Sequence, residues 1–127
     1  TIDWNKASVT VDTTLREWDD RNLKNSFSSL AAIKRKAEER GIKVFLAITP
    51  RSPDYRSTGS YCLFGPRRSV AEKIIQKAKD MGFYVFDENK GGNHDYSDRM
   101  ANNSVHLSIE GAKQFTSRLD SLLKARF

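Results

Sequence analysis

The sequence predicts an α/β fold, a three-layer sandwich in which helices cover both faces of a parallel sheet. A stretch with helical apolar spacing, a glycine and a short apolar run follow one another twice, and the two apolar runs are residues 44–48 and 83–86. Consecutive strands joined through a helix pair in parallel by a right-handed crossover. Apolar runs without polar alternation are typical of strands buried on both faces. We therefore expect helices on both sides of the sheet.

The first helix and strand begin near Leu23. Apolar side chains recur there at helical spacing, and Gly41 is positioned to end the helix. The members of this apolar stripe are Leu23, Phe27, Leu30, Ala31 and Ala37. The run at residues 44–48 has the length and composition of a strand, and Thr49 and Pro50 end it.

The second helix and strand follow the same order. Gly65 and Pro66 can open a helix over residues 67–81, and one apolar stripe runs along it before Gly82. The stripe consists of Val70, Ala71, Ile74, Ile75, Ala78 and Met81. Residues 83–86 then form the second strand, which we expect to lie parallel to the first.

A third helix is predicted from Ser108 to the end of the sequence. Ser108 suits the N-cap position, and Glu110 is a favourable acid in the first turn. The apolar stripe that should pack on the sheet consists of Ala112, Phe115, Leu119, Leu122 and Leu123. Residues 1–22 form a poorly defined N-terminal segment, in which only the alternation of Val9 and Val11 is typical of a short strand.

Length and composition exclude several classes of protein. The 127 residues are expected to form one domain, residues 1–127, without an internal linker. No apolar run approaches the roughly 18–20 residues that cross a bilayer, so we expect no membrane span. The single cysteine, Cys62, cannot form an internal disulfide bond. The net charge is +6, but most lysines lie beside acids on the predicted helices, and we expect no nucleic-acid partner.

Two long loops are the expected location of a ligand site. Ligands of open parallel sheets bind beyond the carboxyl ends of the strands, which here means residues 49–66 and 87–107. The first loop is rich in arginine and aromatic side chains, which suit carboxylates, phosphates and sugar rings. The predicted substrate-binding residues are Arg51, Tyr55, Arg56 and Tyr61. The alternative is a solvated lid that packs on its own aromatic rings.

The second loop ends with His106, immediately before the third predicted helix. A general base needs a pKa near neutrality, and histidine provides one without a large perturbation. His106 is therefore a candidate base, although it could instead help to start the helix or pack under the loop. The other histidine and the acids of this loop match no common metal-binding spacing, and we expect neither a metal nor another cofactor.

Three features of the sequence occur together. They are the order of these elements, the Thr49–Pro50 end of the first strand, and the segment His-Leu-Ser-x-x-Gly-Ala at residues 106–112. From about Leu23 to Phe127 this combination resembles the C-terminal half of an SGNH (GDSL-type) hydrolase. The resemblance implies a flavodoxin-like sandwich, of which the chain represents all or only the C-terminal portion. It also implies a serine nucleophile with His106 as its base, and an extracytoplasmic location.

The chain departs from this family at the acid of the triad. The position three residues before His106, where the family has an acid, is Asn103. An amide cannot stabilise an imidazolium as a carboxylate does, and the change from Asp to Asn in a serine protease triad lowers turnover about ten-thousandfold. The nearby Asp98 or Asp95, or a backbone carbonyl, could orient the ring instead. The candidate catalytic residues are therefore His106, Asn103 and Asp98.

The nucleophile is the second departure, because no Gly-Asp-Ser element follows an N-terminal strand. Ser52, Ser57 and Ser60 are interpreted as ordinary loop serines, so the nucleophile lies upstream of this sequence or the domain is a degenerate relative. The leading hypothesis is ester hydrolysis or acyl transfer on a small-molecule or carbohydrate ester, such as an acetylated sugar. The alternative is a noncatalytic module that binds carbohydrate or an anion through residues 49–66.

Overall fold

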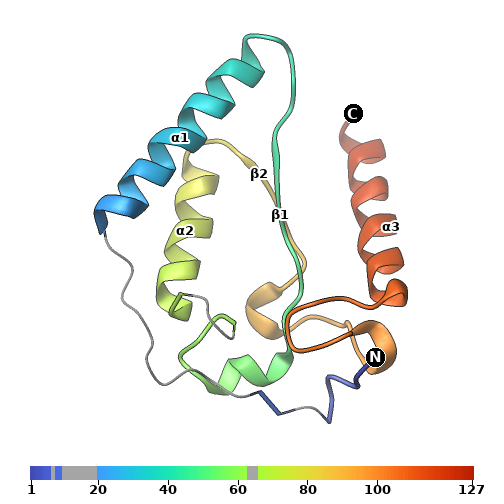
Figure 1. The fold of residues 1–127 in the computed structure, drawn as a ribbon. Helices are drawn as coiled ribbons and strands as arrows, with labels where there is room; N and C mark the ends of the chain where they lie inside the picture. The colour runs from blue at the N-terminus through green and yellow to red at the C-terminus, as the bar shows by residue number, and fades with distance from the viewer. Residues whose placement is uncertain (7, 10–19, 63–65) are drawn as a thin grey trace.

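The computed structural model describes residues 1–6, 8–9, 20–62 and 66–127 (Figure 1). The helices and strands follow the order α1 (Asp20–Glu38), β1 (Phe45–Ile48), α2 (Arg68–Asp80), β2 (Tyr84–Asp87) and α3 (Ile109–Arg126). Three short 3-10 helices lie in the loops, η1 (Pro53–Ser57), η2 (Lys90–Gly92) and η3 (Asp98–Met100). The α/β class is confirmed, and the predicted helices and strands differ from the observed ones by only a few residues at their ends.

The two strands pair in parallel, as predicted. Phe45 lies beside Tyr84 at one end of the pair, and Ile48 lies beside Asp87 at the other. Both strands therefore end at the same edge of the sheet, and the loops that follow them start side by side. This edge positions the candidate site.

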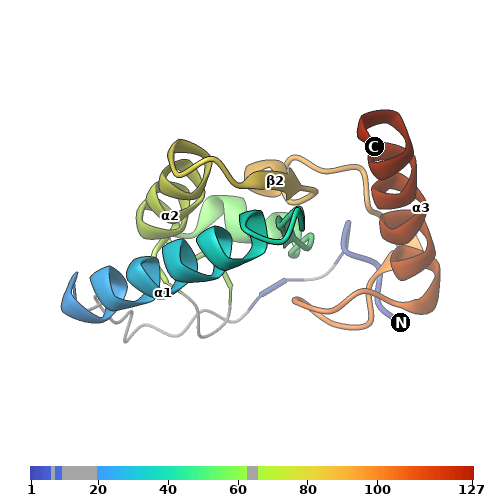
Figure 2. The same cartoon turned by 90° about the horizontal axis from the view of Figure 1, so that it is seen from above.

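Helices lie on both sides of the strand pair (Figures 1 and 2), with α1 and α2 on one side and α3 on the other. Phe27 of α1 is buried, and the ammonium group of Lys77 on α2 lies 4.7 Å from the centre of its ring. On the opposite side, the rings of Phe86 on β2 and Phe115 on α3 meet edge to face, with centroids 5.1 Å apart. Aromatic side chains thus join α1 to α2 and β2 to α3.

The strands are less buried than their apolar sequences predict. In β1, Ala47 is exposed and the other three residues are only half-buried. The reason is that the described residues form a sheet of two strands, so each strand has one edge without a neighbour. The third helix shows a similar difference, because Ala112 is exposed although it belongs to the predicted apolar stripe.

The predicted helix ends are confirmed in atomic detail. Gly41 has a φ of +67°, and the N–H of Ile42 donates to the Ala37 carbonyl over 2.9 Å, which is the pattern of a glycine-terminated helix. At the start of α3, the Ser108 hydroxyl accepts a hydrogen bond from the N–H of Gly111. Local sequence signals were sufficient at both positions, because the capping groups lie within a few residues of the helix they end.

The N-terminal segment packs beside the start of α3, which the sequence did not indicate. The N–H of Ile2 donates to the Ala101 carbonyl over 2.9 Å, and Trp4 is only 2% exposed in a cluster with Tyr96 and Ala101. The strand expected at residues 9–11 lies partly outside the described residues. Val9 is described and is not in a strand, and its N–H donates to a carboxylate oxygen of Asp54.

Gly111 has no room for a side chain, which explains the glycine of the His-Leu-Ser-x-x-Gly-Ala segment. A Cβ atom there would lie 2.2 Å from the Met100 carbonyl oxygen, and that oxygen belongs to the main chain. We expect Gly111→Ala to lower the free energy of unfolding by about 2 kcal/mol or more, since overpacking typically costs about 1–3 kcal/mol. Urea unfolding measures the effect.

Gly59 provides the matched control. A Cβ atom at Gly59 would have no neighbour within 4 Å, and we expect Gly59→Ala to change the free energy of unfolding by less than about 0.5 kcal/mol. Equal stability of the two variants would contradict the close packing of α3 on the segment before it.

Candidate functional site

A cavity of about 260 Å³ lies beyond the carboxyl ends of β1 and β2. Its wall combines the segment after β1, one face of α2 and the segment after β2. All four predicted substrate-binding residues line it, namely Arg51, Tyr55, Arg56 and Tyr61. The structure therefore brings together side chains that the sequence analysis assigned to one site.

The segment after β1 is held by bonds to both neighbouring loops. The N–H of Arg51 donates to Asn89 Oδ1 over 2.8 Å, and the N–H of Ser52 donates to the Ser104 carbonyl over 2.9 Å. Tyr55 is only 3% exposed, so it shapes the wall of the cavity. Buried Asn89 was not singled out from the sequence, and an isolated asparagine in a turn carries no signal that would have identified it.

The cavity carries an excess of positive charge. Its lining includes four cationic side chains and two anionic side chains, so positive charge exceeds negative charge by two. The cations are Arg51, Arg56, Arg68 and Lys79, and the anions are Glu72 and Asp87. Such a lining favours ligands with negative charge.

Asp87 and Tyr61 show how polar groups are arranged in this wall. The carboxylate of Asp87 accepts hydrogen bonds from the N–H groups of Asn89 and Lys90, so it caps the start of the following loop. Burial raises the pKa of Tyr61, and the negative charge of Asp87 raises it further. The Tyr61 phenol therefore stays neutral and can donate a hydrogen bond.

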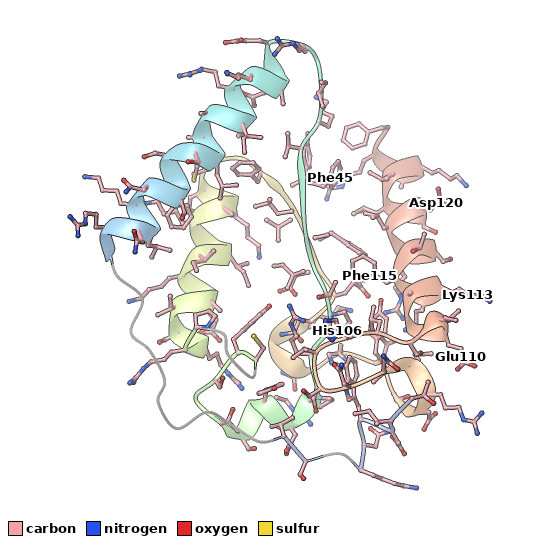
Figure 3. All side chains as sticks on the ribbon, in the orientation of Figure 1. Phe45, His106, Glu110, Lys113, Phe115 and Asp120 are labelled. Atoms are coloured by element: carbon pink, nitrogen blue, oxygen red, sulfur yellow. The ribbon has the colours of Figure 1, made fainter. Side chains whose placement is uncertain are left out.

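The ring of His106 is oriented by Asn103 (Figure 3 shows the position of His106). Asn103 Oδ1 accepts hydrogen bonds from the N–H groups of Val105 and His106 over 3.0 and 2.9 Å, so the amide oxygen faces the histidine. The same oxygen lies 2.9 Å from His106 Nδ1, which must therefore carry the proton of a neutral ring. Nε2 is left as the acceptor on an exposed side chain.

Further hydrogen bonds fix the loop that carries His106. Trp4 Nε1 donates to the Asn103 carbonyl over 2.9 Å, and the N–H of Asn102 donates to the His106 carbonyl over 2.8 Å. Arg51 Nη1 donates to the Val105 carbonyl over 2.6 Å, which connects the loop to the cavity wall. Trp4 was missed as a site residue, because the sequence shows only an isolated tryptophan in an undefined segment.

The acids proposed as alternatives to Asn103 occupy other places. Asp95 forms a bidentate ion pair with Arg118, with distances of 2.7 and 2.6 Å, so the alternative in which Asp95 orients His106 is wrong. These bonds lower the pKa of Asp95 to about 2. Asp98 is exposed at the start of η3, and no hydrogen bond or ion pair joins it to His106 within the described part of the chain.

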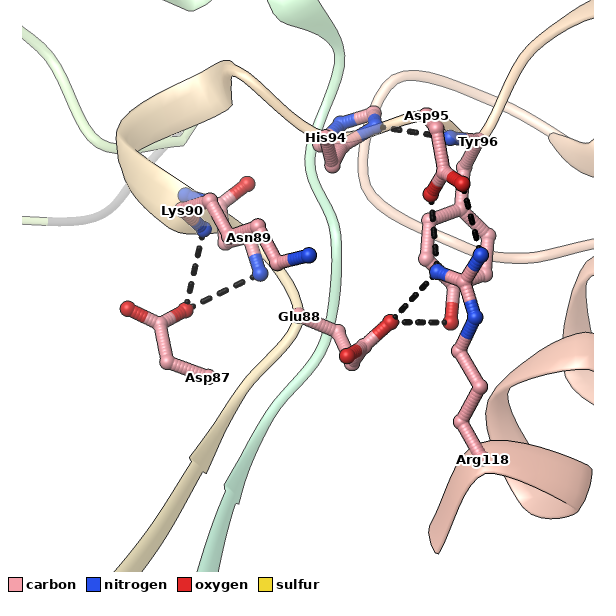
Figure 4. A network of polar contacts seen from close by, with 8 residues as sticks. All are labelled: Asp87, Glu88, Asn89, Lys90, His94, Asp95, Tyr96 and Arg118. Carbon is pink, nitrogen blue, oxygen red and sulfur yellow. Dashed lines mark hydrogen bonds and ion pairs between the residues drawn. The ribbon is translucent and has the colours of Figure 1, made fainter.

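Arg118 also belongs to a partly buried network that attaches α3 to the loop after β2 (Figure 4). Arg118 Nη1 donates to a carboxylate oxygen of Glu88 over 2.9 Å, and the Tyr96 hydroxyl donates to the same oxygen over 2.8 Å. Burial and the Glu88 carboxylate raise the pKa of Tyr96, which keeps its phenol protonated. The network holds α3 in place relative to the end of β2.

His94 lies between the cavity wall and the Trp4 cluster. Its Nδ1 accepts a hydrogen bond from the N–H of Tyr96 over 3.2 Å, so in the neutral ring Nε2 carries the proton and donates to the Arg51 carbonyl. The ring centroid lies 5.2 Å from that of Trp4. Burial lowers the pKa of His94 and outweighs the Arg51 carbonyl and the Asp95 charge, which act in the opposite direction.

The described ranges contain neither a cluster of metal ligands nor a membrane-spanning helix. No group of three or more His, Cys, Asp or Glu residues lies close enough there to hold a metal ion. None of the described helices has the length and apolar character needed to span a membrane.

Three comparisons with known proteins found no relative of this chain. No protein-family model, no curated protein and no solved structure matches the chain. The geometry of the cavity and of the Asn103–His106 pair therefore carries the functional argument.

The lowered pKa of His94 predicts a loss of stability in mild acid. The ordinary pKa is 6.5, and below that pH the unfolded chain binds a proton that the folded chain resists. The free energy of unfolding should therefore fall as the pH decreases from about 7.5 to about 5.5. In His94→Gln this decline should be smaller, as measured by urea unfolding at each pH. Parallel curves for the two proteins would contradict the assignment.

Proposed function

We propose that the protein is an SGNH-type hydrolase domain that cleaves or transfers the acyl group of a small-molecule or carbohydrate ester. The observation that carries the proposal is the orientation of His106. In the neutral ring, the Asn103 oxygen places the proton on Nδ1 and leaves Nε2 as the acceptor on an exposed side chain, which is the tautomer that such a general base requires. The parallel strands with helices on both sides support the flavodoxin-like three-layer fold of that family.

In the proposed reaction a serine hydroxyl attacks the ester carbonyl, and His106 Nε2 accepts its proton. Hydrogen-bond donors stabilise the tetrahedral oxyanion, which collapses and expels the alcohol. His106 returns the proton to that alcohol. A water molecule then attacks the acyl-serine by the same steps, and the acid leaves.

The described serines do not act as partners of His106. Among the described residues, no hydroxyl or thiol group is hydrogen-bonded to His106. Ser52 and Ser60 line the cavity, but the Ser60 hydroxyl donates to the Cys62 carbonyl over 2.7 Å, which fits the expectation that it is a loop serine. The proposal therefore rests on the base and its orientation.

The base can be tested by hydrolysis of para-nitrophenyl acetate. We expect His106→Ala to lower turnover by at least about a hundredfold, since general acid–base catalysis contributes about 10²–10⁴-fold. Lys113→Ala is the control, because Lys113 is an exposed residue of α3 outside the cavity lining. Equal turnover in the His106→Ala and unchanged proteins would exclude His106 from the reaction.

The amide of Asn103 gives a second test, because Asn103→Asp restores a carboxylate without removing an acceptor. The carboxylate can still accept the N–H groups of Val105 and His106, so the loop should fold as before. We expect turnover of the same ester to rise by at least tenfold. This is a part of the roughly 10⁴-fold difference in turnover between Asp and Asn at the acid position of a serine protease triad.

Asn102→Asp is the matched control for this variant. Asn102 is the exposed neighbour of Asn103, and within the described residues no hydrogen bond joins its side chain to the histidine ring. The Asn102→Asp variant adds the same negative charge to the same loop without a contact to His106 Nδ1. If Asn102→Asp accelerates turnover as much as Asn103→Asp, the effect comes from general charge and not from His106.

A noncatalytic binding module is the second candidate function. It is favoured by one observation, namely that the cavity gathers arginine and tyrosine side chains while the described residues pair no serine with His106. This function predicts ligand binding that persists in His106→Ala, together with ester turnover that is the same with and without the histidine. The two candidates therefore give opposite results in the para-nitrophenyl acetate assay.

A further inference from the structure

Two neighbouring donors of the cavity wall lack partners in the described structure. The hydroxyl oxygen of Ser52 and Nε of Arg51 are both buried, and neither makes a hydrogen bond. Ser52 is 0% exposed, and both residues line the cavity beyond the strand ends. A buried donor without a partner is costly, so a group that accepts from both would be stabilised there.

The chemistry of these donors restricts what that group can be. The guanidinium of Arg51 donates hydrogen bonds and cannot accept them. Its Nη1 is already used by the Val105 carbonyl, which fixes the plane of the guanidinium and the direction of the Nε–H bond. Because the nearest partner is a fixed positive charge, an anionic oxygen is a better acceptor than a neutral one.

The surrounding charges favour the same ligand. Arg56 and Arg68 also line the cavity, and each uses part of its guanidinium on a main-chain carbonyl, Pro53 for Arg56 and Tyr55 for Arg68. These bonds hold the cations at the wall while leaving other N–H groups for a ligand. The cavity lining still carries more positive than negative charge when Glu72 and Asp87 are included.

The remaining polar groups suit ligand hydroxyl groups. The carboxylates of Glu72 and Asp87 are acceptors in the same lining, and Tyr61 offers an aromatic face and a phenol that stays protonated. The volume of about 260 Å³ lies just below the roughly 300–1,000 Å³ of pockets for drug-sized ligands. It therefore suits a group of about the size of one sugar unit.

We propose that this cavity is a subsite for an oxyanion carried by a hydroxylated ring, with the oxyanion bound by Arg51 Nε and the Ser52 hydroxyl. A sugar carboxylate and a sugar phosphate share this chemistry. The inference names the ligand class of the cavity, whose lining does not include His106, and rests on the proposed function for its link to ester hydrolysis, but binding alone tests it.

The test is calorimetric titration of the full chain with glucuronate, glucose 6-phosphate, glucose and inorganic phosphate. We expect at least one of the two anionic sugars to bind at least tenfold more tightly than glucose, and the comparison between them identifies the preferred oxyanion. Inorganic phosphate should bind more weakly than glucose 6-phosphate if the ring contributes. Equal affinity for glucose and both anionic sugars, or no binding of either anionic sugar, would overturn the proposal.

Variants of the two donors separate the subsite from general charge attraction. Ser52→Ala should weaken the anionic sugar about tenfold without lowering the urea midpoint, because it removes a buried hydroxyl that has no partner in the free protein. Ser57→Ala is the control, since Ser57 is exposed and its hydroxyl donates to the Asp54 carbonyl. Arg51→Lys keeps the charge but loses Nε, and should also weaken binding. Unchanged affinity in Ser52→Ala and Arg51→Lys would contradict the assignment.

The outcome for His106 distinguishes this inference from the proposed function. Anion binding that persists in His106→Ala, with no histidine-dependent ester turnover, would retain the subsite and reject the hydrolase. Histidine-dependent turnover with no preference for anionic sugars would retain the hydrolase and reject the subsite.

Discussion

The parallel pairing of β1 with β2 is the constraint on which the candidate site depends. Because Ile48 lies beside Asp87, both chain segments leave the sheet at one edge. The N–H of Glu88 then donates to the Ile48 carbonyl, and the N–H of Arg51 donates to the side chain of Asn89. The cavity wall is therefore built from two loops that hold each other. A shift of register would separate these donors from their acceptors.

A buried carboxylate extends this constraint to the third helix. Removing a carboxylate from water is costly unless it is paired and hydrogen-bonded, and Glu88 meets that requirement only through Arg118 and the Tyr96 hydroxyl among the contacts described. The Arg118 side chain comes from α3, so the network selects one position of that helix. The same helix begins after Ser108, and the loop before it, which carries His106, is joined to the segment after β1 by the bond from Arg51 to the Val105 carbonyl. The network thus joins the packing of α3 to the placement of the candidate base.

The sequence predicted the features that depend on residues close in the chain and missed those that depend on residues far apart in the chain. Helix periodicity, the Gly41 and Ser108 caps and the order of the elements depend on residues close in the chain, and these predictions are confirmed. Trp4 illustrates the opposite case, because its role requires Asn103, which lies 99 residues away. The burial of the strands was overestimated, since apolar composition indicates preference for an interior and not the number of neighbouring strands. The four predicted arginine and tyrosine residues line one cavity because they follow one strand.

The Asn103–His106 pair separates two roles that a triad acid combines. An acid fixes the tautomer and direction of the imidazole, and its negative charge stabilises the imidazolium that forms during proton transfer. Asn103 fulfils the first role through one amide oxygen that accepts three donors, two from the main chain and one from the ring. It cannot fulfil the second, because the amide is neutral. Orientation of the base is therefore built into the fold of this loop, whereas charge stabilisation has to come from another group or be absent. A hydrolase that uses this pair would therefore turn over slowly, and the pairing of a serine with His106 is what separates such a hydrolase from a binding module on this scaffold.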